Sequence, residues 1–370
     1  MADATPEAAP APPLGLSSRL VIDRDALARN FQTLRKLAGG AETAASIKAD
    51  AYGLGASALA PRLAREGCRT FFVATPEEGA ELRRALGGGE ADIWVLNGYD
   101  PASRQLYVDQ RLGAVLNQAR ELSDFAQGPT GPCALHLDTG MNRLGFPARD
   151  TDALIAAPGV LDYLDLRLVM SHLACSEDAA HPMNAAQRAR FMALAGRLPQ
   201  ARLSLANTGG VMLGADYHFD LVRPGIGLYG ASASLDIPHP FEPVVRLEAP
   251  ILQVRAVRSG ESVGYGATFT AGQDTLTATA AVGYGDGLPR ALSGRGFARI
   301  GDKRAPILGR VSMDLVVLDV SDCEAELRNG APAVFLGADL TETARLAGTL
   351  PYELLTGLSQ RPARVYEGPL

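Results

Sequence analysis

Between residues 43 and 223, short apolar runs alternate with longer amphipathic stretches of helical length. The apolar runs predict strands at residues 43–48, 71–75, 92–97, 113–116, 133–138, 166–172, 202–206 and 220–223. The amphipathic stretches predict helices at residues 55–66, 76–86, 101–109, 117–126, 149–157 and 184–197. Eight strands that alternate with helices favour a (β/α)8 TIM barrel. A doubly wound open sheet fits the same pattern, because periodicity does not show whether a sheet closes.

After the linker signal His239-Pro-Phe-Glu-Pro243 the pattern changes to short strands separated by Gly-rich turns. The predicted strands are residues 244–257, 275–283, 297–301, 305–309, 315–319 and 332–335, and the predicted helices are residues 339–346 and 352–357. We therefore expect a C-terminal, mostly-β domain over residues 241–370. The barrel is expected over residues 17–240, although its first strand, 18–22, could join the β domain instead.

The N-terminal residues 1–16 are rich in Ala and Pro, without a basic start or a continuous apolar core. This composition predicts a disordered tail and not a secretory signal. The net charge of −6 argues against nucleic acid or an acidic membrane as the main partner. No apolar run is long enough to predict a membrane span. The four cysteines are widely spaced without a Cys-x-x-Cys pair, which favours reduced thiols in the cytoplasm over disulfides or a metal site.

Lys48 ends the first predicted barrel strand and is one of only three lysines in the chain. The other two, Lys36 and Lys303, lie in polar segments that predict a solvated surface. Partial desolvation at a strand end lowers the pKa of an amine and leaves it usable for Schiff-base chemistry with a carbonyl cofactor. The local sequence fits equally well a lysine that only extends its charged end to solvent.

An ordered series of motifs between about residues 18 and 366 resembles the alanine racemases that depend on pyridoxal 5'-phosphate (PLP). The motifs are Lys48-Ala-Asp-Ala-Tyr52-Gly53, Asp138-Thr-Gly-Met-Asn-Arg143, Ser171-His172, Asn207-Thr208, residues 222–229, Val263-Gly-Tyr265, Tyr284-Gly-Asp286, Ser312-Met313-Asp314, Pro351-Tyr352-Glu353 and residues 361–366. The resemblance implies a cytoplasmic homodimer that interconverts L-alanine and D-alanine. It would either supply D-alanine for peptidoglycan or catabolise it.

The same resemblance implies roles for individual residues. Lys48 would bind PLP covalently and act as one base, and Tyr265 would act as the opposing base from the partner subunit. Arg143 and His172 would support the tyrosine. Arg223 would donate to the pyridine nitrogen. The other implied cofactor-binding residues are Tyr52, Asn207, Thr208, Gly225, Ile226 and Tyr352, and the implied substrate-binding residues are Arg143, Tyr265, Tyr284 and Met313.

One position departs from the family pattern. The family often has a carbamylated lysine two residues before Asp138, where this chain has His136. Histidine does not form such a stable carbamate, so the group that holds Arg143 must differ.

Three readings compete with an alanine racemase. A decarboxylase of the same fold group would usually place an acidic residue in the position of Arg223. A broad-specificity or serine racemase would more often be exported. A non-catalytic PLP-binding barrel would lack the domain that carries Tyr265.

Overall fold

The computed structural model describes residues 14–128, 131–232, 234–236 and 238–370. The chain divides into two compact units. Of the described residues, the barrel unit comprises those within 28–228, 232–241 and 370, and the sheet unit comprises 14–27, 229–231 and 242–369. Most of the predicted tail, residues 1–13, lies outside the described residues.

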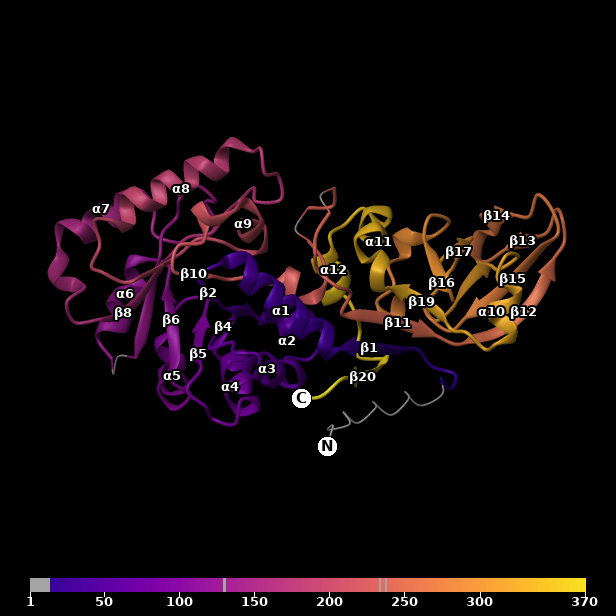
Figure 1. Cartoon of the computed structure of the whole chain (residues 1–370), viewed down its shortest axis with the longest axis horizontal. Helices are drawn as coiled ribbons and strands as arrows, with labels where there is room; N and C mark the ends of the chain where they lie inside the picture. The colour runs from indigo at the N-terminus through magenta and orange to yellow at the C-terminus, as the bar shows by residue number, and fades with distance from the viewer. Residues whose placement is uncertain (1–13, 129–130, 233, 237) are drawn as a thin grey trace, which may run out of the picture. The chain divides into compact units, whose positions relative to one another are not determined.

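Parallel strands form the centre of the barrel unit (Figure 1). They are β2 (Glu42–Thr43), β3 (Ala45–Ser46), β4 (Thr70–Val73), β5 (Asp92–Val95), β6 (Leu112–Leu116), β7 (Pro132–His136), β8 (Asp165–Met170), β9 (Arg202–Ser204) and β10 (Leu221–Val222). Strands β3 to β9 pair in sequence order, and β10 pairs with β2. Because β2 and β3 are two pieces of one strand, the barrel has eight strands in the described part of the chain.

Backbone hydrogen bonds close this barrel on both sides of β10. The Ala44 N–H, between β2 and β3, donates to the Val222 carbonyl at 2.9 Å. On the other side, the Arg223 N–H donates to the Ala206 carbonyl, just after β9, at 2.8 Å. The predicted (β/α)8 barrel is therefore confirmed, and the open doubly wound sheet is excluded.

Helices surround the barrel strands (Figure 1). They are α1 (Arg24–Ala38), α3 (Ala56–Arg65), α4 (Pro76–Ala85), α5 (Arg104–Asp109), α6 (Ala119–Ala126), α7 (Ala148–Ala156), α8 (Pro182–Ala195) and α9 (Thr208–Leu213). Apolar side chains from successive strands, including Phe72, Trp94 and Leu168, form one buried cluster. The Trp94 ring lies over Gly113, where an added Cβ would be only 2.4 Å from it. The apolar strand pattern thus produces a packed core and not a pore.

The sheet unit contains a mixed nine-stranded sheet of order β12-β15-β18-β17-β16-β19-β11-β1-β20. Its strands are β1 (Arg19–Asp23), β11 (Val245–Ala249), β12 (Ile251–Val257), β15 (Thr275–Ala280), β16 (Phe297–Ile300), β17 (Lys303–Leu308), β18 (Val316–Asp319), β19 (Ala333–Leu336) and β20 (Ala363–Glu367). A separate hairpin joins β13 (Ser262–Val263) to β14 (Phe269–Thr270). The helices of this unit are α10 (Glu324–Arg328), α11 (Leu340–Ala347) and α12 (Pro351–Thr356).

This sheet differs from the predicted strand pattern in its first strand, in the break within residues 244–257 and in β20, which is not predicted. Strand β1 pairs with β11 and β20, so residues 18–22 lie in the sheet unit and not in the barrel. The single strand predicted at residues 244–257 is two strands, β11 and β12, separated at Pro250. Proline has no backbone N–H for a sheet ladder, which accounts for the break.

Asp286 is a buried carboxylate that anchors the C-terminal segment of the sheet unit. It accepts hydrogen bonds from Arg361 Nε at 2.8 Å and from Arg361 Nη2 at 2.6 Å. The Ser18 hydroxyl and the Gly283 N–H also donate to it, at 2.9 Å and 2.8 Å. Removing the carboxylate would leave several donors unpaired in a site shielded from water.

We predict that Asp286→Ala lowers the free energy of unfolding of the sheet unit by about 2–3 kcal/mol. Asp314→Ala is the matched control, because Asp314 also accepts from Arg361, at 2.5 Å, but its side chain is 63% exposed. An exposed ion pair contributes at most about 1 kcal/mol. Urea denaturation followed by circular dichroism measures both variants, and equal losses would contradict the role of the buried carboxylate.

Candidate active site

The candidate residues of the barrel unit follow its strands at their C-terminal ends. Lys48 follows β3, Arg143 follows β7, His172 follows β8 and Arg223 follows β10. The charges of Arg223, Arg143 and Lys48 all act on the His172 imidazole, which places these four side chains near one another. Parallel barrel strands open their C-terminal ends on one face, where barrel enzymes have their active sites.

Lys48 begins a left-handed turn, α2 (Lys48–Tyr52). The four residues from Ala49 to Tyr52 have φ between 51° and 58°. Such backbone costs roughly 1–2 kcal/mol for each residue with a side chain. The strand and helix pattern of the sequence does not predict this left-handed form. The structure must therefore stabilise the turn through contacts with neighbouring segments.

The turn brings Tyr52 back against the barrel strands. The hydroxyl of Tyr52 hydrogen-bonds to the Ser46 side chain. It also lies against Gly225, where an added Cβ would be 2.2 Å from the Tyr52 oxygen. Glycine is thus required at position 225 for the phenol to reach the end of β10.

The environment of Lys48 favours the free amine. Lys48 is half-buried, and this burial is the main cause that lowers its pKa. The positive charge of Arg143 lowers the pKa further, whereas the carboxylate of Glu78 raises it. Desolvation and a neighbouring cation both disfavour the ammonium form, so the amine is more available as a nucleophile than that of an exposed lysine.

Arg223 is a buried cation with one nitrogen still available. Its Nη2 donates to the Ser171 carbonyl at 2.6 Å, and its Nη1 donates to the Ser204 hydroxyl. Burial lowers its pKa to about 9, so it remains charged at neutral pH. No acceptor among the described residues bonds to Nε. Because arginine only donates, Nε is suited to an acceptor atom of a bound ligand.

His172 is a neutral imidazole in this cationic surrounding. Burial is the first cause that holds its pKa well below the ordinary value, and the charges of Arg223 and Arg143 act in the same direction. At neutral pH the ring therefore has one donor and one acceptor nitrogen.

His136 is also neutral, and its tautomer follows from its neighbour Asn117. The Asn117 Nδ2 donates to the carbonyls of Leu96 and Val115, at 3.2 Å and 3.0 Å. Asn117 Oδ1 must then accept from His136 Nδ1–H, at 2.8 Å. Burial lowers the His136 pKa to about 4. Its Nε2 is therefore an unprotonated acceptor.

Gln187 of α8 joins the loops that carry Arg143 and His172. Its buried Nε2 donates to the His172 carbonyl at 2.8 Å and to the Thr139 hydroxyl at 3.2 Å. Its Oε1 accepts from the Ala174 N–H at 2.8 Å. Arg143 itself is exposed and has no ion pair within the described ranges. Gln187 thus holds both loops through hydrogen bonds, while the Arg143 guanidinium stays available for a ligand.

Polar groups also gather where β9 and β10 end. The Thr208 hydroxyl accepts from the Gly225 N–H at 3.0 Å. Asn207 caps α9 by accepting from the Gly210 N–H at 2.9 Å, and Ile226 is buried beside Gly225. Clusters of hydroxyl groups and backbone N–H groups of this kind are suited to binding an anionic group.

The remaining candidates belong to the sheet unit. Tyr265, Tyr284 and Met313 are 74%, 44% and 54% exposed, which is high for large apolar side chains. Ser312, which precedes Met313, lies near both tyrosines. It lines a cavity of about 540 Å³ together with Tyr265, and the Ser312 carbonyl accepts a hydrogen bond from the Tyr284 N–H at 3.1 Å. Tyr352 lies on α12 and is partly buried. Groups of exposed apolar side chains are typical of surfaces that bind another molecule.

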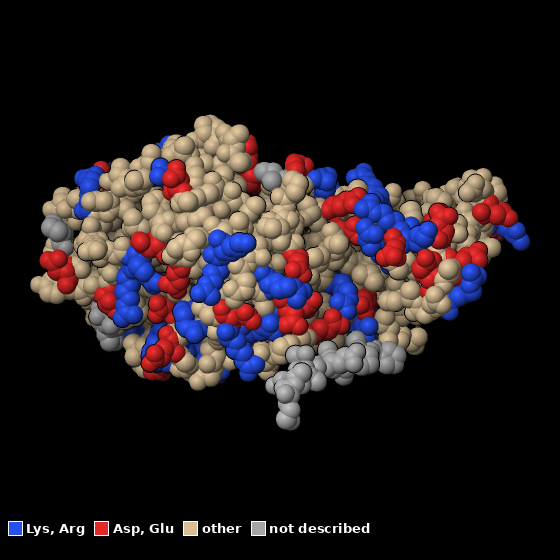
Figure 2. Space-filling model, viewed as in Figure 1, with Lys and Arg blue, Asp and Glu red and all other residues tan. Residues whose placement is uncertain are grey.

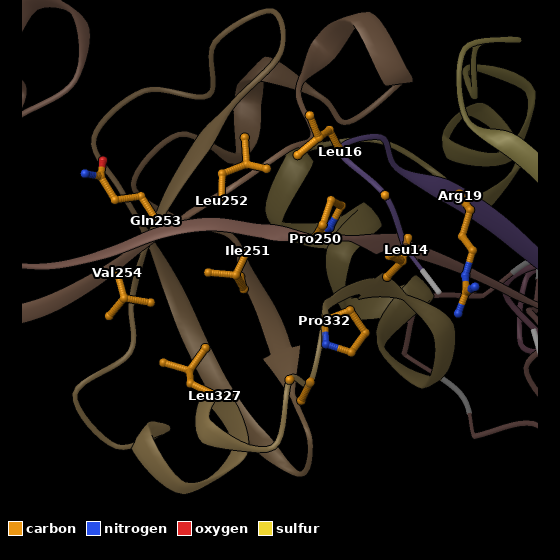
Figure 3. Close-up of a pocket in the computed structure, with 13 residues that line it drawn as sticks. Leu14, Leu16, Arg19, Pro250, Ile251, Leu252, Gln253, Val254, Leu327 and Pro332 are labelled. Carbon is orange, nitrogen blue, oxygen red and sulfur yellow. The ribbon is translucent and has the colours of Figure 1, made fainter. Parts of the chain in front are cut away.

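A larger cavity of the sheet unit, about 720 Å³, offers no catalytic group (Figure 3). Its lining is mostly apolar and includes Leu16, Leu252 and Val254. Its charged side chain, Arg19, is paired with Glu248 at 2.6 Å. No acid, base or nucleophile among the described residues lines it, so volume alone does not make it the catalytic site.

The described part of the chain shows no extended charged surface in Figure 2, no metal-binding cluster and no membrane-spanning helix. Lys and Arg side chains are interspersed with Asp and Glu on the face shown in Figure 2, without a continuous field of one sign. No group of three or more His, Cys, Asp or Glu residues is arranged to hold a metal in the described ranges. None of the described helices combines the length and the apolar character needed to cross a bilayer.

Three residues that shape this site carry no sequence motif: Glu78, Asn117 and Gln187. Their partners lie in other loops, so a search for motifs does not find them. For Glu78 the sequence offers one indication: it stands three residues after Thr75 at a helix start, where a glutamate commonly caps the helix.

Two family models match the chain in succession. "Alanine racemase, N-terminal domain" matches residues 22–233, and "Alanine racemase, C-terminal domain" matches residues 244–366. The catabolic alanine racemase of Agrobacterium fabrum is 43% identical over 363 residues, which covers 96% of this chain and 93% of that protein. The alanine racemase of Rhodospirillum rubrum is 44% identical over 358 residues, which covers 94% of this chain and 96% of that protein.

Solved structures agree with these matches. The alanine racemase of Bartonella henselae, solved with covalently bound pyridoxal phosphate, has a TM-score of 0.89 and 35% identity, covering 95% of this chain and 100% of that chain. The biosynthetic alanine racemase of Pseudomonas aeruginosa has a TM-score of 0.89 and 34% identity, covering 96% and 100%. The chain therefore belongs to the alanine racemase family, whose members use PLP to interconvert L-alanine and D-alanine.

Proposed function

We propose that this chain racemises alanine with two bases, Lys48 and Tyr265, one on each face of the substrate Cα. The observation that carries the proposal is the half-buried Lys48 amine, which has a lowered pKa and stands at the end of β3 among Arg143, His172 and Arg223. Bound PLP supplies the electron sink that makes the Cα proton acidic. Each base then needs only to take or return that proton.

Lys48 has two tasks in this proposal. Its amine would hold the cofactor covalently, and the same amine would serve as the base on one face of the substrate Cα when substrate is bound. Both tasks require the uncharged form. The lowered pKa of Lys48, caused first by burial and then by Arg143, supports them.

Tyr265 is proposed as the opposing base, supported by Arg143 and His172. The guanidinium of Arg143 would favour the ionised phenol and bind the substrate carboxylate. Neutral His172 would hydrogen-bond to the phenol without adding a charge. The free, exposed guanidinium of Arg143 supports this double task.

Arg223 and the strand-end donors are proposed to hold the cofactor. Nε of Arg223 would donate to the pyridine nitrogen and keep it unprotonated, which weakens the electron sink and suits racemisation. The proposed phosphate-binding residues are Tyr52, Asn207, Thr208, Gly225, Ile226 and Tyr352. The packing of the Tyr52 hydroxyl against Gly225 and the bond from Gly225 to Thr208 support a shared anion site.

We propose a homodimer in which Tyr265 and Met313 complete the partner's site, with Tyr284 at the entry. The exposure of all three side chains supports this assignment. The proposed domains are the PLP-binding barrel, within residues 17–240, and the β domain, residues 241–370, which strand 18–22 joins by pairing with β11 and β20. Both biosynthetic and catabolic enzymes are among the similar proteins, so either role fits.

We also propose that the enzyme works in the cytoplasm. Its four cysteines are all free, and three of them are buried. Free buried thiols are typical of proteins in a reducing compartment.

We predict that Tyr265→Phe slows removal of the α-proton from L-alanine about 10²–10⁴-fold, which is the usual contribution of a general base. Removal from D-alanine, assigned to Lys48, should slow less. Deuterium wash-out from each enantiomer, in separate reactions with PLP, measures the two directions. Tyr163→Phe is a control, because Tyr163 is an exposed tyrosine of the barrel unit. Equal losses for the two enantiomers would contradict the assignment of one base to each face.

We predict that Lys48→Ala and Tyr265→Ala, each inactive alone, regain activity when their subunits are mixed and exchanged. Each mixed dimer would have one site with both native bases, so random exchange should restore roughly a quarter of the wild-type activity. Native mass spectrometry confirms that mixed dimers form. Mixed dimers without activity would show that both bases come from the same chain.

A further inference from the structure

Glu78 connects the left-handed turn to the neighbouring barrel strand. Its Oε1 accepts from the Ala49 N–H at 2.8 Å, and its Oε2 accepts from the Ala74 N–H at 2.7 Å. Ala49 directly follows Lys48, and Ala74 directly follows β4. One carboxylate therefore bridges the C-terminal ends of β3 and β4.

The start of α4 holds this carboxylate in place. The Thr75 hydroxyl accepts from the Glu78 N–H at 3.3 Å, and Pro76 occupies the first helical position. In a capping box, the acid three residues after the cap bonds back to the N–H of the cap residue. Here the Glu78 carboxylate bonds to Ala74 and Ala49 instead, so it reaches beyond its own helix start.

The left-handed turn needs such a contact at its first N–H. Two later N–H groups have backbone acceptors: the Ala51 N–H donates to the Ile47 carbonyl at 2.9 Å, and the Gly53 N–H donates to the Ala49 carbonyl at 2.7 Å. The far end is held by Asp50, whose carboxylate accepts from the Ala56 N–H at 2.6 Å. The Ala49 N–H, at the near end, is bonded to Glu78.

We propose that Glu78 is a positioning residue for Lys48: its carboxylate holds the Ala49 N–H and so fixes where the Lys48 amine stands at the barrel mouth. The inference rests on the proposed covalent role of Lys48. Glu78 does not touch the reacting atoms. It acts through the backbone of the strained turn and through its negative charge.

The negative charge of Glu78 affects the pKa of Lys48, and a purely structural role of Glu78 would not change that pKa. The Glu78 carboxylate raises the pKa of Lys48, against the lowering by burial and by Arg143. Removing the charge must therefore lower the Lys48 pKa further. More free amine would then be present at low pH, while the amine itself would be held less well.

The test compares Glu78→Gln with Glu77→Gln in the full-length chain, freed of cofactor and then mixed with PLP at a series of pH values. Absorbance follows covalent attachment. For Glu78→Gln we expect the midpoint of the pH profile to fall by about 0.5 unit and the plateau rate to fall roughly tenfold. Glu77→Gln removes the same charge from the same helix, and its exposed side chain should leave both values unchanged.

Glu78→Asp distinguishes the effect of the negative charge from the effect of side-chain length. It also serves as the test variant if Glu78→Gln does not fold. It keeps the charge but shortens the side chain, so the plateau should fall while the midpoint stays. Glu78 variants that match Glu77→Gln in midpoint and plateau, even with reduced thermal stability, would overturn the proposal and leave Glu78 a helix cap. Lys48→Ala, run alongside, must show no covalent attachment. If attachment persists there, the role of Lys48 fails, whatever the Glu78 variants show.

Discussion

The proposed site depends on holding one amine at the mouth of the barrel, where burial and a neighbouring cation disfavour its charged form. A flexible exposed lysine would be fixed poorly and would remain an ammonium at neutral pH. Lys48 instead ends a buried strand and begins a left-handed turn, where burial and Arg143 lower its pKa. The strain of that turn is offset by two hydrogen bonds, which the Ala49 N–H donates to the Glu78 carboxylate and the Ala51 N–H donates to the Ile47 carbonyl. Local strain and a depressed pKa therefore occur together at this position.

The charges around Lys48 suit an anionic ligand. Arg143 and Arg223 are cations, and the nearby His172 and His136 are held neutral by burial and by those cations. A cofactor with a phosphate and a substrate with a carboxylate both bring negative charge to such a region. The neutral imidazoles supply hydrogen-bonding groups without increasing the repulsion. The tautomer of His136, fixed by Asn117, leaves its Nε2 as a neutral acceptor.

The sequence predicts the barrel well, because its buried parallel strands are short apolar runs separated by amphipathic helices. It also places Lys48, His172 and Arg223 at strand ends. The β13–β14 hairpin and β20 are not predicted, since two-residue strands and an end strand carry little periodic signal. The left-handed turn is not predicted either, because Ala and Tyr rarely adopt positive φ and only long-range contacts impose it. One such contact is with Glu78, 29 residues away from Ala49.

Covalent attachment of PLP to Lys48 is the central claim, and the scarcity of lysine makes it directly measurable. The chain has only Lys36, Lys48 and Lys303. Borohydride reduction of the holoenzyme followed by peptide mass mapping identifies which lysine carries the pyridoxyl group. We predict the added mass on the Lys48 peptide alone. A pyridoxyl group on Lys36 or Lys303, with Lys48 unmodified in an enzyme inactivated by the reduction, would contradict it.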